Sequence, residues 1–376
     1  MIQAISIIAL IFALVRLTIA LSNYIFFLSL KRKDLVYEPM LSILIPARNE
    51  EKNIANILDD LHKQEYKNAE IIVLDDNSSD NTAGVVKEKM KKDKRVSLIF
   101  NDHVPAGWSG KNYACHLLSG NAGGRYLLFI DADIGIGCNI ISEMTRYMTQ
   151  ERLVLVSIFP KQLMHSFGER ITVPIMNLIL LSLLPLKLVR SCREPSLAAA
   201  NGQFMLFDAE FYRRYKPHEM LRSSLVEDIE IMRWIKKLKP GNEADKRSES
   251  RYRTAVLTGD RRISCRMYED FNEAVHGFSK NILHFFGNSL VWTSVFLFLT
   301  GPVIIFLILH SLTVTFTFLL LNVITRTLVS LNSKQNIIFN ILLAPLQQLS
   351  FYFIVYKAVR IKLTGKYTWK GRRIEI

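Results

Sequence analysis

Short apolar runs alternate with helical patterns through the region that follows residue 38. Residues 126–130 are five consecutive apolar or aromatic residues, a run typical of a fully buried strand. Ile54, Ile57 and Leu61 recur instead at the spacing of one helix face. Strands that alternate with helices predict an α/β domain with a doubly wound, mostly parallel sheet. The predicted strands are residues 40–45, 70–74, 96–100 and 126–130.

The beginning of the chain is apolar over a length that can cross a bilayer. Residues 1–30 carry one charge, Arg16, and are followed by the basic residues Lys31, Arg32 and Lys33. A cleaved signal peptide would carry its positive charge before the apolar run. We therefore expect a retained transmembrane anchor, with the following domain in the cytoplasm.

Further apolar segments follow the predicted α/β region. Residues 289–331 are long enough for two spans with a break near His310, and residues 337–356 for one. Residues 171–189 are interrupted by two prolines, and we expect an interfacial or membrane-dipping segment there. Three spans after a cytoplasmic domain would place the basic tail outside, against the positive-inside tendency, so the number of spans stays open. The predicted divisions are an anchor at 1–30, a catalytic domain at 38–270, an amphipathic interface segment at 271–288, a transmembrane block at 289–357 and a basic cytoplasmic tail at 358–376.

The net charge of +14 is concentrated beside the apolar segments. That placement favours contact with anionic lipid headgroups, and the chain shows no nucleic-acid-binding signature. The four cysteines are far apart and include no C-x-x-C, so the sequence indicates neither a zinc site nor a disulfide framework.

The central predicted strand ends in two aspartates, Asp131 and Asp133. Side chains at positions i and i+2 of an extended segment point to the same side. Ligands of open α/β sheets bind at the carboxyl ends of the strands. Two carboxylates there suit Mg²⁺ or Mn²⁺ that also takes diphosphate oxygens. The alternative is a polar turn after a core strand, so the surrounding residues decide.

Two other segments suit a nucleotide. The loop at 107–112 lacks the pattern of a kinase or ATPase phosphate loop, but its glycines, a helix N-terminus and Lys111 can hold a diphosphate. The alternative is a capped turn with a solvated lysine. Asp75 and Asp76 end a strand at the edge that holds Asp131, where a carboxylate can accept hydrogen bonds from a base or ribose. The alternative is an N-cap for the next helix.

A second acidic pair, Glu227 and Asp228, opens a helical pattern. One acid would deprotonate an acceptor hydroxyl while the other positions it, although the helix dipole alone also favours acids there. The small-residue turn Asn201, Gly202 and Gln203 would let an acceptor approach the backbone closely. Lys280, just before the second apolar block, would neutralise a departing diphosphate or simply snorkel at the interface.

These motifs together resemble membrane-bound family 2 glycosyltransferases with the GT-A fold. The resemblance rests on P-A-R-N-E at 46–50, L-D-D-N-S-S-D at 74–80, D-A-D at 131–133, E-D at 227–228 and G-F-S-K-N at 277–281. Shorter strings are similar to the branch that glycosylates carotenoids and related isoprenoid lipids, including diaponeurosporenoate and chlorobactene glycosyltransferases. They are G-W-S-G-K-N-Y-A-C at 107–115, S-C-R-M-Y at 264–268 and T-W-K-G-R at 368–372.

The resemblance implies nucleotide contacts at Pro46, Glu50 and Asp76, a metal–diphosphate held by Asp131 and Asp133, and Asp228 as the base. Two positions depart from the family pattern. Val226 replaces a common threonine, and the segment with Phe278 and Lys280 lacks the Q-x-x-R-W of processive polymer synthases.

We therefore expect an inverting transferase that moves one hexose, glucose from a UDP-sugar, to a membrane lipid. The alternatives are a processive polysaccharide synthase and a membrane protein that binds a sugar nucleotide without turning it over.

Overall fold

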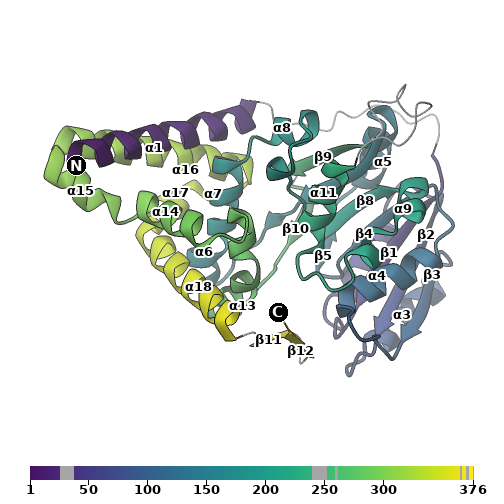
Figure 1. The fold of residues 1–376 in the computed structure, drawn as a ribbon. Helices are drawn as coiled ribbons and strands as arrows, with labels where there is room; N and C mark the ends of the chain where they lie inside the picture. Colours follow the sequence, from purple (N-terminus) through teal and green to yellow (C-terminus); the bar gives the residue numbers. More distant parts are fainter. Residues whose placement is uncertain (26–37, 239–251, 259–260, 365, 370–371, 376) are drawn as a thin grey trace. The chain divides into compact units, whose positions relative to one another are not determined.

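Figure 1 shows the computed structural model of the chain. It describes residues 1–25, 38–238, 252–258, 261–364, 366–369 and 372–375. The chain divides into two compact units. We call Leu28–Lys161 with Leu188–Cys265 the sheet unit, and Met1–Phe27, Gln162–Lys187 and Arg266–Ile376 the helical unit. The basic cluster at 31–33 and tail residues 365, 370, 371 and 376 lie outside the described residues.

A seven-stranded sheet forms the core of the sheet unit. Its strands are β1 (Leu41–Ala47), β2 (Ala69–Asp76), β3 (Val96–Asn101), β4 (Tyr126–Ile130), β6 (Leu153–Phe159), β8 (Phe204–Asp208) and β9 (Arg253–Thr258). Their order is β3-β2-β1-β4-β8-β6-β9. The first four strands in this order run parallel, and so do β6 and β9. β8 runs antiparallel to both β4 and β6.

This arrangement confirms a mostly parallel sheet. The four predicted strands all form, with β4 at its predicted bounds and all five of its residues buried. Because β2, β1 and β4 are parallel neighbours, their carboxyl ends meet at one edge of the sheet. The acidic motifs that follow β2 and β4 were predicted to lie at such an edge. The antiparallel β8, followed by β6 and then β9, completes the sheet beyond the predicted strands.

Amphipathic helices connect these strands. Residues Ile54, Ile57 and Leu61, predicted to form one helix face, are buried in α2. The helices of the sheet unit are α2 (Ile54–His62), α3 (Thr82–Lys92), α4 (Gly110–Gly120), α5 (Ile140–Gln150), η1 (Pro195–Leu197), α9 (Ala209–Tyr215), α10 (Pro217–Met220) and α11 (Glu227–Lys237), with α8 (Leu186–Ser191) at its boundary.

A short antiparallel pair lies directly after the D-A-D motif. β5 (Ile134–Ile136) pairs with β10 (Ile263–Cys265), so that Cys265 lies opposite Ile134. A further two-residue strand is β7 (Lys161–Gln162). The pairing of β5 with β10 brings a distant part of the chain next to Asp133.

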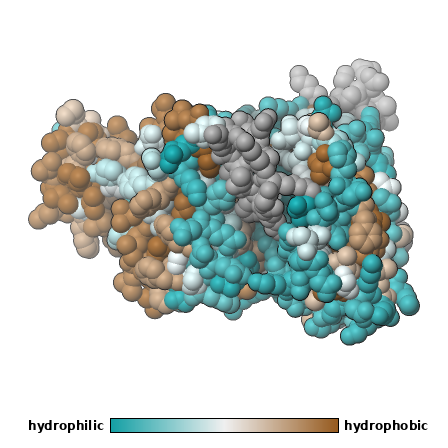
Figure 2. Space-filling model, turned by 90° about the horizontal axis from the view of Figure 1, so that it is seen from below, coloured by the Kyte–Doolittle hydropathy of each residue, from teal (hydrophilic) through white to brown (hydrophobic). Residues whose placement is uncertain are grey.

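The helical unit is built from helices, most of which are apolar. They are α1 (Ile2–Ile25), α6 (Phe167–Thr172), α7 (Pro174–Leu183), α13 (Phe271–Asn281), η2 (Ile282–Phe286), α14 (Leu290–Thr300), α15 (Val303–His310), α16 (Leu312–Asn332), α17 (Ile337–Leu342) and α18 (Ala344–Thr364), followed by β11 (Lys366–Trp369) and β12 (Arg372–Glu375). Large hydrophobic side chains on α1 and α16 are exposed, including Ile7, Ile11, Phe316 and Leu320. Figure 2 shows such brown, hydrophobic residues gathered on the surface of this unit. An exposed apolar surface of this kind suits contact with lipid.

Among the described helices, α1 and α16 are long and apolar enough to cross a membrane, and the count rises to 3 if the bent pair Phe271–Phe286 and Leu290–Thr300 is one span. The predicted break near His310 lies between α15 and α16. The chain also breaks after Thr300, so residues 289–331 form three helices. Residues 337–356 fall in α17 and α18, which are not among the candidate spans.

Residues 171–189 are divided among three short helices. The break between α7 and α8 is held by Asn23 of α1. Its Nδ2 donates to the carbonyls of Leu181 and Leu184 at 2.9 Å, and its Oδ1 accepts from the backbone of Leu186 at 2.8 Å. α7 packs on α1 inside the helical unit, so the helix break is satisfied by a side chain in place of water.

Candidate active site

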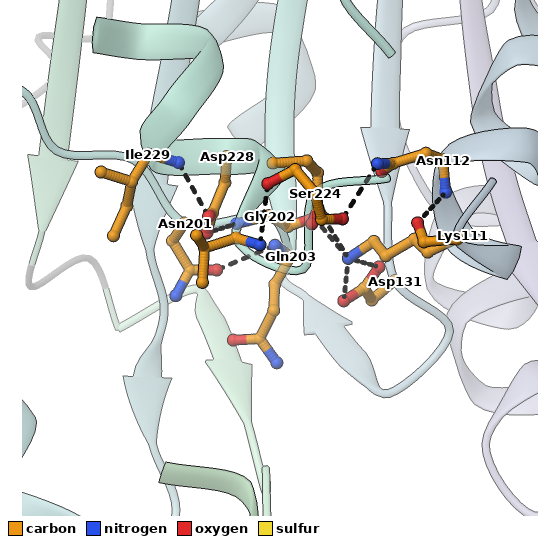
Figure 3. Close-up of polar contacts among 12 residues, drawn as sticks. Lys111, Asn112, Asp131, Asn201, Gly202, Gln203, Ser224, Asp228 and Ile229 are labelled. Atoms are coloured by element: carbon orange, nitrogen blue, oxygen red, sulfur yellow. Dashed lines mark hydrogen bonds and ion pairs between the residues drawn. The ribbon is translucent and has the colours of Figure 1, made fainter. Parts of the chain in front are cut away.

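Asp131 and Lys111 form the centre of the site. Asp131 follows β4, and its backbone N–H donates to the carbonyl of Gln203. Lys111 Nζ lies 2.9 Å from one carboxylate oxygen of Asp131 and 3.0 Å from the other. The Lys111 side chain is 36% exposed and that of Asp131 27%, so both reach the surface of the sheet unit. Figure 3 shows the two side chains pointing at each other.

The loop that carries Lys111 is fixed by the start of α4. Ser109 caps this helix by accepting from the backbone of Asn112. The side-chain Nδ2 of Asn112 donates to the carbonyl of Leu221 at 2.7 Å. It also donates to the carbonyl of Ser224 at 3.1 Å (Figure 3). The capped turn of the alternative interpretation is therefore present. The solvated lysine that this interpretation predicted is absent, because Lys111 is paired with the carboxylates of Asp131 and Glu227.

Glu227 and Asp228 lie at the start of α11 and face the same lysine. Glu227 is buried, and its Oε1 lies 3.7 Å from Lys111 Nζ. Burial lowers the pKa of Lys111, but the carboxylates of Asp131 and Glu227 outweigh it and hold that pKa above its usual range. The lysine therefore stays charged.

Asp228 binds the turn at 201–203. One carboxylate oxygen accepts from the backbone of Gly202 at 2.9 Å and the other from Ile229 at 2.8 Å (Figure 3). Burial, followed by repulsion from Glu227, raises the pKa of Asp228 to about 6. A carboxylate with this pKa is ionised at neutral pH and is a stronger base than an ordinary aspartate.

Gly202 lies where a side chain would collide with the site. A Cβ at this position would be 3.2 Å from Lys111 Nζ and 3.3 Å from Glu227 Oε1. The Gly202 carbonyl also accepts from Lys111 Nζ at 3.3 Å. Asn201 Oδ1 accepts from the backbone of Gln203 at 2.8 Å, and Ser157 of β6 donates to the Asn201 carbonyl. The turn thus joins the two acidic motifs.

Asp133 has the environment of a cation ligand. Its Oδ1 is buried and accepts no hydrogen bond from the described residues, while its Oδ2 lies 3.4 Å from the Cys265 sulfur. Gln203 Nε2 donates to the same sulfur at 2.8 Å, and Gln203 Oε1 is a second buried acceptor without a partner there. Burial, then the charges of Asp131 and Glu50, raises the pKa of Asp133 to about 6.

These observations test whether a divalent metal fits. Orphaned carboxylate and amide oxygens are hard ligands of the kind that Mg²⁺ and Mn²⁺ prefer. Among the described residues, no three Asp, Glu, His or Cys side chains gather as a metal cluster. Asp131 and Asp133 therefore fit a metal that also takes oxygens from a bound diphosphate and water.

The predicted nucleotide edge lies at the ends of β1 and β2. Asp75 and Asp76 are buried. Asp75 accepts from the backbone of Ser78 at 2.9 Å, and Asp76 accepts from Asn101 Nδ2 at 2.8 Å. Neither caps α3, whose N-cap residue is Asn81, so the capping alternative is wrong. Asp75 instead holds the turn after β2, and Asp76 joins the ends of β2 and β3.

Pro46 and Glu50 lie at the end of the neighbouring strand and beyond it. Pro46 of β1 is in register with Leu74 of β2, and the Glu50 backbone donates to Thr82 Oγ1 at 2.8 Å. The charge of Glu50 contributes to the raised pKa of Asp133, so the nucleotide edge and the metal pair are close enough to interact.

The structure brings most predicted site residues to one part of the sheet unit. Lys280 is the exception, since it lies in α13 of the helical unit. Sequence reasoning missed Cys265, Ser157 and the structural role of Asn112. Cys265 lies in the S-C-R-M-Y string, whose presence was the one available signal.

The chain is similar to known glycosyltransferases in sequence and in fold. Residues 42–216 match the family model Glycosyl transferase family 2. The 4,4'-diaponeurosporenoate glycosyltransferase of Staphylococcus haemolyticus (strain JCSC1435) is 34% identical over 134 residues, which are 35% of this chain and 35% of that protein. The UDP-Glc:alpha-D-GlcNAc-diphosphoundecaprenol beta-1,3-glucosyltransferase WfgD of Escherichia coli is 35% identical over 94 residues, 25% of this chain and 35% of that protein. The matches thus span about a third of the length of these relatives.

A solved structure is similar over nearly the whole chain. It is the mannosyltransferase PcManGT from Pyrobaculum calidifontis in complex with GDP-Man and Mn²⁺, matched over 97% of this chain and 99% of that chain. The TM-score is 0.54 at 16% sequence identity, a likeness that shows the fold alone. It agrees with the predicted GT-A fold.

Proposed function

Because residues 42–216 form a family 2 glycosyl transferase domain, we propose that the chain transfers a single hexose, glucose from UDP-glucose, to a carotenoid or related isoprenoid lipid. The observation that carries the proposal is the cluster of Lys111, Asp131, Glu227 and Asp228 around the 201–203 turn. The names of two relatives support the acceptor class, one a glycosyltransferase of diaponeurosporenoate and the other of a diphosphoundecaprenol-linked sugar.

The donor would lie along the edge formed by β2, β1 and β4. Pro46, Glu50, Asp75 and Asp76 would contact the base and ribose. Asp131 and Asp133 would hold Mg²⁺ or Mn²⁺ on the diphosphate. When bound, the metal would neutralise charge that develops on the departing diphosphate.

The transfer step uses the base beside the 201–203 turn. Asp228 takes the proton of the acceptor hydroxyl, and the resulting oxygen forms a bond to the anomeric carbon as the bond from that carbon to the diphosphate breaks. Attack opposite the leaving group inverts the anomeric configuration. Asn201, Gly202 and Gln203 would position the acceptor, and Glu227 would keep Lys111 in place. An acceptor carboxylate is already ionised at neutral pH and would need the base less.

Lys111 is the cation of the sheet unit that would stabilise the negative charge on the leaving diphosphate. Its ammonium already lies between two carboxylates, so it is held in position before the donor binds. We propose that Lys280 adds a second cation.

We place the reaction at the cytoplasmic face of the cell membrane. α1 and α16 suit a multi-pass protein, and anionic lipid headgroups would contact the basic segments beside the apolar ones.

Washed membranes from cells that express the chain test this function. They would be incubated with UDP-glucose labelled in the sugar and with Mn²⁺ or Mg²⁺, and label would be followed into an organic-solvent extract. We expect metal-dependent label in the extract, lost in Asp228→Asn. The matched control is Glu230→Gln, which changes a nearby acid of α11 that lies outside the proposed machinery.

Other outcomes would contradict the proposal. Label that stays in water-soluble polymer would indicate a polysaccharide synthase. Measurable UDP binding without incorporation into any lipid extract would indicate a non-catalytic sugar-nucleotide-binding protein.

A further inference from the structure

In the helical unit, Arg16 and Arg326 contact no acidic side chain of the described residues. Arg16 lies in α1 and Arg326 in α16. These helices are in contact, and each is long and apolar enough to cross a membrane. The helices α1, α7 and α14 to α18 contain no aspartate or glutamate. A cation in apolar surroundings without a counter-ion is costly, and ionisable residues in such helices commonly mark a functional site.

The groups in direct contact with Arg16 are neutral. It is 3% exposed. Its Nε donates to Ser182 Oγ and its Nη1 to Asn322 Oδ1, each at 3.1 Å. The guanidinium lies 5.6 Å from the ring centre of Phe12 and 5.5 Å from that of Phe296. Its Nη2 donates to no group in the described part of the chain, so one edge of the charge remains unsatisfied.

Arg326 lies close to Arg16 and offers a matching edge. Asn322, which accepts from Arg16, is four residues before Arg326, about 6 Å along α16. Arg326 Nη1 donates to the Asn340 carbonyl at 3.1 Å and to Gln347 Oε1 at 2.6 Å. Its Nε and Nη2 have no partner among the described residues. These two nitrogens form the side-on fork with which arginine binds both oxygens of a carboxylate or phosphate.

The position of the pair suits a lipid end group. Arg326 is only half-buried, so its side chain reaches the surface of the helical unit. It lies six residues, about 9 Å, before the end of α16, and Arg16 lies nine residues, about 14 Å, before the end of α1. An anion that binds this far from the ends of apolar helices would have to leave water. We therefore expect it to be attached to an apolar chain that stays among the helices.

We propose that Arg16 and Arg326 bind the anionic end group, a carboxylate or phosphate, of a membrane lipid. The fork of Arg326 takes two oxygens of this group, and Arg16 supplies the second positive charge. Gln347 holds the Arg326 guanidinium in the required orientation. This site needs no donor nucleotide and is independent of the proposed transfer reaction.

The test measures lipid binding by the full chain in neutral detergent, without a sugar nucleotide. The probes are cis-parinaric acid, a fluorescent polyene carboxylic acid, and the corresponding alcohol. We expect the acid to bind about tenfold more tightly than the alcohol, since its hydrogen bonds are charge-assisted. Arg326→Gln should remove this preference. Arg326→Lys should keep part of it, because the charge remains while the fork is lost.

Arg360→Gln is the matched control, since Arg360 is an exposed arginine of α18, and it should keep the full preference. Equal binding of acid and alcohol by the unmodified chain would overturn the proposal without reference to any variant. So would a preference that survives in Arg326→Gln. Phosphatidic acid should displace the probe; displacement by inorganic phosphate at equal concentration would show a free-anion site and overturn the assignment to a lipid.

Discussion

Lys111 is the cation that joins Asp131 and Glu227 in the described part of the sheet unit. It lies against Asp131 and Glu227, and their carboxylates keep it charged. Asp133 and Asp228 add further acidic groups whose pKa values burial raises. The site therefore has an excess of acid over base, which suits a metal ion that arrives with the diphosphate.

Metal binding should depend on the nucleotide. Because no three-ligand cluster is present among the described residues, we expect weak Mn²⁺ binding by the chain alone and binding at least tenfold tighter with UDP. Electron paramagnetic resonance of free Mn²⁺ measures both affinities. Asp133→Asn should remove the effect of UDP, and an equally tight metal site without UDP would contradict this account.

Activity should fall as the pH decreases through about 6. The pKa of Asp228 is raised from 3.8 to about 6 by burial and by Glu227, so the base is protonated below that pH. The pH profile of kcat with saturating donor and metal measures this. A profile that stays flat down to pH 4.5 would show that the base is another group, or that the acceptor needs none.

The same pKa predicts an opposite change in stability. Between pH 4 and 6 the folded chain binds a proton at Asp228 that the unfolded chain has already released. The free energy of unfolding of the unmodified chain, relative to Asp228→Asn, should therefore rise as the pH falls from 6 to 4. Denaturant unfolding of both proteins measures this difference in the free energy of unfolding. The contribution of Asp133, whose pKa is also raised, cancels because both proteins contain it.

Gly202→Ala should reduce activity with little loss of stability. The new methyl group would be 3.2 Å from Lys111 Nζ and 3.3 Å from Glu227 Oε1, so the lysine must move. We expect a decrease in kcat/KM of about tenfold or more, since small displacements in a site are costly. Gly120→Ala is the control, because nothing lies within 4 Å of its Cβ position. Equal activities of the two variants would show that Lys111 tolerates displacement.

At the scale of elements, the site depends on contacts between segments far apart in the sequence. The start of α4 is joined to the loop before α11 by Asn112, which is fully buried. The end of β4 is joined to β8 by the backbone bond from Asp131 to Gln203, and β10 brings Cys265 to Asp133. These contacts set the distance between the two acidic motifs.

Asn112→Ala should loosen this arrangement. The substitution leaves the carbonyls of Leu221 and Ser224 without their donor, and we expect the free energy of unfolding to fall by about 1–3 kcal/mol. Activity should fall as well, since Lys111 is the preceding residue. Asn121→Ala, an exposed asparagine at the end of the same helix, should change stability by less than about 0.5 kcal/mol. Similar unfolding midpoints for the two variants would contradict the structural role of Asn112.

These contacts explain what the sequence predicted and what it missed. β2 and β4 contain apolar runs that are followed by acids, and these acids could be found because strand ends in parallel sheets meet at one edge. The antiparallel direction of β8 depends on its neighbours in the sheet. Cys265 pairs with residues more than a hundred positions away, and no local pattern encodes such a pairing.

At the scale of the whole molecule, the chain combines a sheet unit of the GT-A type with a helical unit of apolar helices. The helical unit is formed by segments from both ends of the chain and from its middle. Its packing therefore depends on folding of the full chain. Its breaks at Thr300 and at 184–185 were only partly visible in the sequence. Gly301 and the prolines end helices and could be read from the sequence. The position of these helix breaks in a bilayer depends on how the helices pack, which no local pattern encodes.

The most direct test of the central claim is the stoichiometry of the reaction with the purified chain. The chain in lipid vesicles that contain an isoprenoid acceptor would be supplied with UDP-glucose and Mn²⁺, and released UDP and glycosylated lipid would be counted together. The account predicts one UDP for each glycosylated lipid, each lipid carrying one hexose, and neither product with Asp228→Asn. Release of UDP without glycolipid, or several hexoses on each lipid, would contradict it.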